Sequence, residues 1–194
     1  MKWMIASDIH GSAIYCKKLL ERYKAEGAER LLLLGDLLYH GPRNDLPKEY
    51  GPKAVIEMLN GIKDEVLCVR GNCDTEVDQM VLEFDIMADY AYICDGECRI
   101  FATHGHRFNT SSLPSLKKGE ILLHGHTHVP ACEEHEGFVY LNPGSVSIPK
   151  NGSEHSYMTF DGTVFEWKNL DGEVYRNYAI KVGSYGFQVK GLEF

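Results

Sequence analysis

Short, mainly apolar runs alternate with longer segments of mixed polarity in the first part of the chain. The apolar runs lie within residues 2–7, 30–36 and 65–72. Strands of a parallel sheet are often continuously apolar, because both faces of the sheet are covered. The intervening segments, residues 13–26 and 54–61, have the pattern of amphipathic helices. This alternation predicts a βαβαβ unit in which parallel strands are joined by right-handed crossovers.

The first predicted helix has signals at both ends. Ser12 belongs to the residue types that cap helix N-termini, and Gly27 suits the left-handed position that ends a helix. Leu19, Leu20 and Tyr23 belong to its apolar stripe. The sequence therefore predicts a helix over residues 13–26 that Ser12 caps and Gly27 terminates.

After residue 84 the pattern changes to short strands separated by turns. Residues 91–106 contain two apolar runs around Asp95-Gly96, which is typical of a hairpin. The tail, residues 181–194, has no strong period and is expected to be an extra edge strand or a loose terminus. No repeat or linker interrupts residues 1–194, so we expect a single domain. Further strands are predicted within residues 119–126, 137–146, 156–169 and 172–180.

Composition narrows the class of protein. The 194 residues suffice for one well-buried domain, and a hydrophobic fraction of 44% is typical of globular chains. A net charge of −8 argues against bulk attraction to nucleic acid or to anionic membranes. The N-terminal apolar run is shorter than a signal peptide needs, and the six cysteines lack the spacing of a disulfide framework. We expect a soluble, cytoplasmic protein with reduced thiols and no membrane partner; its sequence leaves a homo-oligomer open.

Residue types that bind metals follow the predicted strands. In open α/β sheets, ligands bind beyond the carboxyl ends of the strands. Each residue is weak evidence alone, because Gly-Asp often caps a helix and Gly-Asn suits a left-handed turn. Their occurrence at successive strand ends predicts one shared site. The residues are Asp8, His10, Asp36, Asn72, His104, His106, His126 and His128.

Three histidines, His124, His126 and His128, occupy every second position after an apolar run. In an extended strand these side chains would point to the same face. The pattern is typical of a metal site, although surface histidines also cluster by chance.

This ordered set of motifs resembles the calcineurin-like metallophosphoesterases. It comprises D8-I-H10, G35-D36, G71-N72, H104 and G125-H126-T-H128, and the resemblance covers residues 4–149. Within that family the chain is most similar to the small prokaryotic phosphodiesterases of the YfcE type. The resemblance implies an α/β fold of the α/β/β/α sandwich type, with two mixed sheets face to face and helices outside.

The family resemblance also implies a ligand set for two divalent metal ions. One ion would bind Asp8, His10, Asp36 and His128, and the other Asp36, Asn72, His104 and His126. Two ions roughly 3.5–4 Å apart can activate a bridging hydroxide and bind the oxygens of a phosphate ester. Because a bridging ligand needs two donor oxygens, Asp36 is the expected bridge. Imidazole with carboxylate and amide oxygen fits Mn²⁺, Fe, Co²⁺, Ni²⁺ or Zn²⁺, and Mn²⁺ is our first choice.

Other histidines and one arginine lie outside the predicted ligand set. We expect His106, His40 and Arg43 to contact the phosphate together with Asn72, although a solvated loop explains His40 and Arg43 equally well. His124 is expected to pack or to support a ligand, and Thr127 to face away. His135 and His155 are predicted to lie at the surface.

One position departs from many relatives of this family. They carry Gly-Asn-His before an acidic residue, and that histidine stabilises the transition state or protonates the leaving group. Here Cys73 takes its place in G71-N72-C73-D74. A thiol is a poor proton donor, so we expect weak assistance to the leaving group unless another histidine supplies the proton. A small packing residue is the simplest interpretation of Cys73.

The sequence thus predicts a metal-dependent phosphodiesterase that acts on a small phosphodiester. Two alternatives share the fold: a phosphomonoesterase, and a non-catalytic protein-binding scaffold like a related eukaryotic trafficking subunit. Such scaffolds lose part of the metal set, whereas this chain keeps every expected ligand type. The loop of residues 37–51, which would shape the pocket, is not readable from sequence.

Overall fold

The computed structural model describes residues 1–96 and 98–180. The predicted tail, residues 181–194, lies outside the described residues. The elements in chain order are β1 (Trp3–Ala6), α1 (Ala13–Glu26), β2 (Arg30–Leu33), α2 (Pro52–Asn60), the 3₁₀ turn η1 (Lys63–Glu65), β3 (Val66–Cys68), α3 (Glu76–Gln79), β4 (Tyr90–Asp95), β5 (Cys98–Thr103), β6 (Glu120–His124), β7 (Ala131–His135), β8 (Phe138–Asn142), β9 (Ser156–Phe160), β10 (Val164–Asn169) and β11 (Val174–Ala179).

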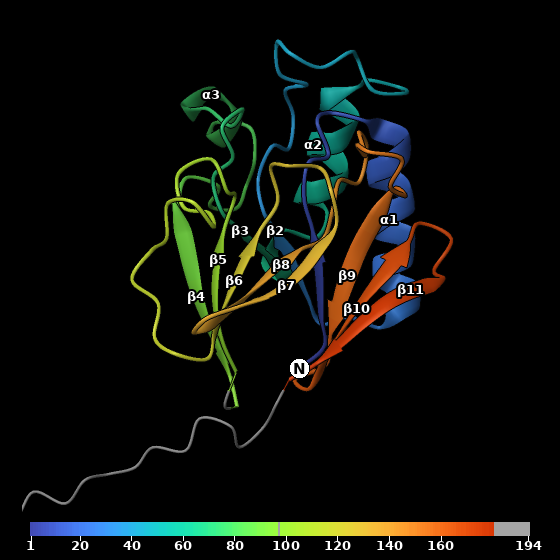
Figure 1. Ribbon diagram of the computed structural model, residues 1–194. Helices are drawn as coiled ribbons and strands as arrows, with labels where there is room; N and C mark the ends of the chain where they lie inside the picture. Colours follow the sequence, from blue (N-terminus) through green and yellow to red (C-terminus); the bar gives the residue numbers. More distant parts are fainter. Residues whose placement is uncertain (97, 181–194) are drawn as a thin grey trace, which may run out of the picture.

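Two mixed sheets face each other, as predicted (Figure 1). The first has the order β11-β10-β9-β1-β2-β3, and its β1, β2 and β3 are parallel. The second has the order β4-β5-β6-β8-β7, with β5, β6 and β8 parallel between antiparallel edge strands. The βαβαβ unit thus supplies half of the first sheet, and the hairpin predicted from residues 91–106 supplies β4 and β5.

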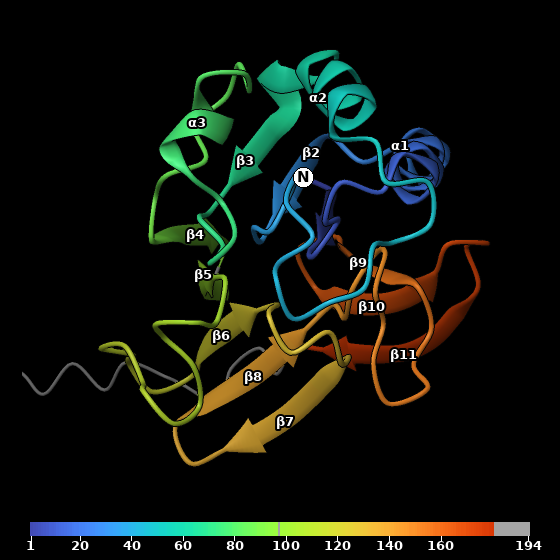
Figure 2. The ribbon, with the colours of Figure 1, turned by 90° about the horizontal axis from the view of Figure 1, so that it is seen from above.

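Successive residues of β1 and β2 face two different cores. Met4 and Leu31 pack with α1 and α2, whereas Ile5 and Leu32 pack between the sheets. Figure 2 shows α1 and α2 on the side of β1, β2 and β3 that faces away from the second sheet. Burial on both faces explains why these strands are continuously apolar. Between the sheets, the indole of buried Trp167 donates a hydrogen bond to the Asn142 carbonyl at 2.7 Å.

The outer face of the second sheet is covered by a connecting segment. Phe101, Leu122 and Tyr140 form a small core there, and Phe108 and Leu116 from the β5–β6 connection pack against it.

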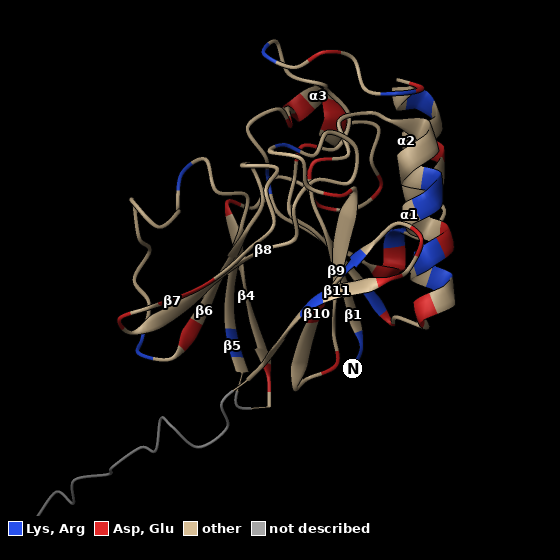
Figure 3. Ribbon diagram, turned by 45° about the vertical axis from the view of Figure 1, so that its right-hand side comes forward, with Lys and Arg blue, Asp and Glu red and all other residues tan. Residues whose placement is uncertain are grey.

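Figure 3 shows many charged residues on α1 and α2, whereas most of the length of the strands carries none. No helix in residues 1–96 or 98–180 is long and apolar enough to cross a membrane.

The start of α1 differs from the prediction. Gly27 ends α1 in the left-handed conformation, as predicted, but the Ser12 side chain makes no capping bond. Its hydroxyl instead donates to the Lys48 carbonyl at 2.6 Å, because the loop of residues 37–51 folds back over the start of the helix. Three elements were not predicted: the 3₁₀ turn η1, the four-residue helix α3, and β7, a largely exposed edge strand. The six cysteines, all among the described residues, form no disulfide.

Candidate metal centre

The strand ends bring the predicted ligands into one cluster. Asp8 and His10 follow β1, Asp36 follows β2, and Asn72 follows β3. From the second sheet, His104 directly follows β5, while His126 and His128 lie four residues or fewer beyond β6. The cluster therefore forms where the carboxyl ends of strands from both sheets meet, as the sequence predicted.

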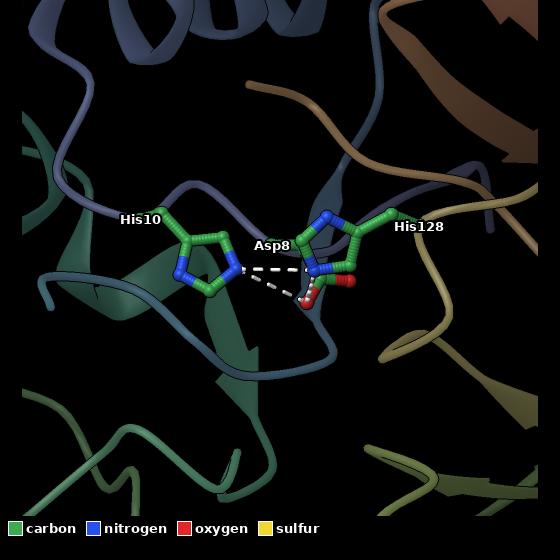
Figure 4. Close-up of side chains that lie close together, drawn as sticks. All are labelled: Asp8, His10 and His128. Atoms are coloured by element: carbon green, nitrogen blue, oxygen red, sulfur yellow. Dashed lines mark hydrogen bonds and ion pairs between the residues drawn. The ribbon is translucent and has the colours of Figure 1, made fainter. Parts of the chain in front are cut away.

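Asp8, His10 and His128 form the first part of the cluster (Figure 4). The Nε2 atoms of His10 and His128 lie 3.6 and 3.2 Å from Oδ1 of Asp8. The two Nε2 atoms are 3.2 Å apart. All three side chains are buried, so two imidazoles and a carboxylate converge on a point shielded from solvent.

Backbone carbonyls fix the tautomers of these rings. Nδ1 of His10 donates to the Tyr39 carbonyl at 2.8 Å, and Nδ1 of His128 donates to the Ile148 carbonyl at 2.7 Å. A neutral ring that donates from Nδ1 keeps its lone pair on Nε2. Two facing lone pairs repel each other unless a cation or a proton lies between them. This arrangement fits a metal ion.

Asp36, Asn72, His104 and His126 form the second part. Nε2 of His104 lies 3.4 Å from Oδ2 of Asp36, 3.1 Å from Oδ1 of Asn72 and 3.1 Å from Nδ1 of His126. Its Nδ1 donates to the Leu34 carbonyl at 2.7 Å. The ring of His104 thus also presents a lone pair to the cluster, among oxygen and nitrogen donors that suit a transition metal.

Asp36 lies between the two parts. Its Oδ2 is 3.8 Å from Nε2 of His10 and 3.4 Å from Nε2 of His104. Its other oxygen accepts a hydrogen bond from the Cys73 amide at 2.8 Å, which fixes the carboxylate plane. The Asp36 carboxylate is therefore placed to bind two cations at once.

The charges of the cluster agree with this arrangement. Burial opposes ionisation of Asp8, but hydrogen bonds with His10 and His128 outweigh it and hold the pKa well below its usual range. Burial likewise opposes a charge on His104, yet the bond and charge of Asp36 raise its pKa to about 9. Burial and the neighbouring His104 lower the pKa of His126 to about 4. In the absence of metal, protons on imidazole compensate the buried carboxylates.

The backbone is strained at five of the predicted ligands. Asp8, His10, Asp36, His126 and His128 all have φ between 49° and 67°. Side-chain-bearing residues rarely adopt this left-handed region, and such strain concentrates at functional sites. The left-handed backbone also explains why His124, His126 and His128 do not all point to one face, as they would in an extended strand. Strand β6 ends at His124, so the orientation of His126 and His128 is set by a left-handed loop.

Two glycines are required by close approach. A Cβ on Gly71 would overlap with Oδ1 of Asp36, and a Cβ on Gly125 would overlap with the Ser7 hydroxyl. Neither Gly71 nor Asn72 has a positive φ, so the left-handed turn considered for Gly-Asn does not form. The glycines in these motifs allow adjacent ligand loops to touch.

Asp74 is a site residue that sequence reasoning missed. It is buried, and its carboxylate accepts hydrogen bonds from the amides of Asp36 at 2.8 Å, Leu37 at 2.9 Å and Gly71 at 2.7 Å. Asp74 thereby ties the loop after β3 to the loop after β2. The only signal in the sequence was an acidic residue beside Gly-Asn-Cys.

The residues expected around the phosphate lie at different distances from the cluster. The ring of His106 lies 5.4 Å from that of His104 and 6.4 Å from that of His126, and burial lowers its pKa. His40 packs edge-on against Tyr39 and Tyr50 at 4.7 and 5.4 Å. Arg43 is exposed on the same loop. The ring of His106 thus lies beside two of the predicted ligands.

The remaining histidines pack elsewhere. His124 stacks on Tyr140 at 4.3 Å, which agrees with the packing role considered for it. His135 is exposed and pairs with Glu133 at 3.2 Å, as expected for a surface residue. The prediction for His155 was wrong in part: the ring is partly buried because it stacks on Tyr15 at 4.0 Å.

Cys73 faces the cluster. Its sulfur, a ring nitrogen of His10 and a carboxylate oxygen of Asp36 all lie within 4.8 Å of one another. Burial, with the nearby carboxylate of Asp36, raises the pKa of the thiol far above its ordinary value. Cys73 therefore stays protonated at neutral pH and is a very weak acid.

Comparisons with known proteins agree with this geometry. Residues 1–163 match the model of the calcineurin-like phosphoesterase superfamily domain. Phosphodiesterase YfcE of Escherichia coli K12 is 48% identical over 164 residues, which cover 84% of this chain and 89% of that protein. The solved structure of YfcE, a phosphoesterase from E. coli, superposes with a TM-score of 0.90 at 46% identity, covering 93% and 100% of the two chains. Vacuolar Protein Sorting 29 from Cryptosporidium parvum, 20% identical with a TM-score of 0.61 over 92% and 97%, shares the fold.

Proposed function

Since the chain belongs to the calcineurin-like phosphoesterase superfamily, we propose that it hydrolyses phosphodiester bonds with two divalent metal ions held at the strand ends. The observation that carries this proposal is the position of Asp36 between the rings of His10 and His104. Each ring donates a hydrogen bond from Nδ1 to a backbone carbonyl and turns its Nε2 toward Asp36. The high identity to a phosphodiesterase over most of both chains supports the diester substrate.

Each ion has its own set of ligands in this proposal. The first takes Asp8, His10, Asp36 and His128. The Nε2 atoms of His10 and His128 lie beside Oδ1 of Asp8, and Oδ2 of Asp36 lies 3.8 Å from Nε2 of His10. The second takes Asp36, Asn72, His104 and His126, which converge around Nε2 of His104. When bound, the ions would neutralise phosphoryl oxygens and acidify a water molecule.

The protein's own groups prepare the site for this chemistry. The carbonyls of Tyr39, Leu34 and Ile148 orient three rings, so that their Nε2 atoms face the cluster without rearrangement. The hydrogen bonds of Asp74 hold the two loops that carry Asp36 and Asn72 in register. Such preorganisation is what positions a phosphate ester for in-line attack.

Manganese is the proposed metal. Two carboxylates, one amide oxygen and imidazole nitrogens form a mixed donor set that suits Mn²⁺ or the later first-row ions better than Ca²⁺. Asn72, His106, His40 and Arg43 are proposed to contact the substrate. His106 has the best support, because its ring lies beside His104 and its Nδ1 makes no hydrogen bond within the described residues.

We further propose that the protein works in the cytoplasm on small diesters. Free thiols at all six cysteines fit a reducing compartment. The net charge of −8 disfavours bulk binding of nucleic acid.

The phosphomonoesterase and the scaffold are the competing functions. A scaffold needs no intact ligand set, whereas seven predicted ligands meet in one cluster here. Assaying the Mn²⁺-loaded protein against bis-4-nitrophenyl phosphate and 4-nitrophenyl phosphate decides among the three. Our proposal expects faster turnover of the diester. Faster turnover of the monoester would support a phosphomonoesterase, and no turnover of either substrate would support a scaffold.

A further inference from the structure

A cavity of about 360 Å³ lies beside the metal cluster. Three segments form it: the loop after β2, the start of α2, and the stretch from Cys73 to Val81. Its apolar lining consists mainly of Leu38, Tyr39, Tyr50, Ile56, Val77 and Val81. The volume falls in the range of pockets that bind small molecules.

The cavity and the metal cluster share a wall. Cys73 lines the cavity, and its sulfur also lies within 4.8 Å of ligand atoms of His10 and Asp36. Tyr39, a second lining residue, accepts the hydrogen bond from Nδ1 of His10 at its carbonyl. Because the Cys73 sulfur borders both spaces, a phosphate ester at the cluster would lie next to the cavity.

The chemistry of the lining is apolar. Its carboxylate, Asp78, already accepts hydrogen bonds from the amide and hydroxyl of Thr75 at 2.7 and 2.8 Å. Cys73 contributes a thiol, which is a weak hydrogen-bonding group. Among the described residues, the lining includes neither Lys nor Arg. A second phosphate or a carboxylate would find no counter-charge there, whereas apolar surface would be removed from water.

We infer that this cavity binds an uncharged, apolar substituent of the phosphodiester substrate, such as an aryl or branched alkyl group. The inference rests on the proposed function, because the phosphate of the same molecule must lie at the metal ligands. It goes further by naming the substrate class: a diester with a compact apolar group rather than a polyanion.

Val77 and Val81 offer a clean test. They are 68% and 43% exposed, so replacing them leaves the core intact. Met80 is the matched control, because it is 82% exposed in the same stretch and does not line the cavity. The variants are Val77→Ser with Val81→Ser, and Met80→Ser alone. All three changes are neutral, so they do not alter the field at the cluster.

The measurement is calorimetric binding of phenylphosphonate and methylphosphonate to the Mn²⁺-loaded protein. Both probes carry the same anion and differ only in the apolar group. We expect phenylphosphonate to bind at least about 10-fold more tightly, as is typical of apolar pockets. The double variant should lose most of this preference while its affinity for methylphosphonate stays the same, and Met80→Ser should keep the preference.

Three outcomes would overturn the inference. Equal affinity for both probes in the wild type would show that the cavity takes no apolar group. A preference that survives in the double variant would place the phenyl group elsewhere. Failure of both probes to bind, together with absent diester hydrolysis, would overturn the proposed function as well, whereas equal binding with intact hydrolysis would overturn the inference alone.

Discussion

The Nε2 atoms of His10 and His128 face each other at 3.2 Å, although each ring already donates its Nδ1 hydrogen to a backbone carbonyl. The fold thus fixes two lone pairs in opposition beside the buried Asp8 carboxylate. Proton or metal binding relieves this repulsion, so the two compete for the same nitrogens.

This competition predicts that metal affinity rises with pH. The carboxylates raise the pKa of His10, despite burial, and raise that of His104 to about 9. Below about pH 9 the metal-free ring of His104 is protonated and must lose its proton before it binds metal, and the raised pKa of His10 acts in the same direction. Calorimetric affinity for Mn²⁺ should therefore increase from about pH 6 to about pH 9, with proton release that diminishes over the same range. Affinity independent of pH would show that protons do not compete with the metal for these ring nitrogens.

Asp36→Asn should abolish turnover. The amide keeps the shape of the side chain but lacks the negative charge that a group shared between two cations needs, and loss of a ligand should cost more than the 10–100-fold typical of supporting residues. His124→Ala is the matched comparison, because His124 is buried nearby but stacks on Tyr140. It should lower stability and leave kcat largely unchanged. Similar residual kcat in the two variants would show that Asp36 is not the bridge.

Asp74→Asn should weaken metal binding without removing a ligand. Asp74 accepts three backbone N–H bonds, and an amide group would turn one N–H donor toward another. We expect roughly 10–100-fold weaker Mn²⁺ affinity and a loss of about 1–3 kcal/mol in the free energy of unfolding. Glu76→Gln is the control, because Glu76 is exposed in the same region. Equal metal affinity in the two variants would exclude a positioning role for Asp74.

The ligands were predictable because each one follows an apolar strand, and strand ends of an α/β fold converge. Asp74 was not, because its role arises only when the loops after β2 and β3 meet in space. The same applies to the Ser12 hydroxyl, whose partner Lys48 lies on a loop without a sequence pattern. Strand alternation wrongly predicted that His124 points to the same face as His126 and His128, because left-handed residues interrupt the strand after His124.

Cys73 predicts a steep dependence of rate on the leaving group. The thiol stays protonated and is too weak an acid to assist a basic alcohol, whereas general acid catalysis is typically worth roughly 10²–10⁴-fold. Across a series of methyl aryl phosphodiesters, turnover should fall steeply as the pKa of the leaving phenol rises. Cys73→His should flatten this dependence.

Two other histidines provide the controls for that series. If the wild-type dependence is shallow and His106→Ala makes it steep, then His106 supplies the proton. The same reasoning applies to His40→Ala. A shallow dependence that none of the three variants changes would contradict the role assigned to Cys73.

The position of Asp36 between two metal ions is the central claim, and anomalous diffraction from Mn²⁺-soaked crystals tests it most directly. We expect two peaks per chain, about 3.5–4 Å apart, with the Asp36 carboxylate in contact with both. His128 should contact only the first ion and His104 only the second. A single peak, or two peaks of which only one contacts Asp36, would contradict the account.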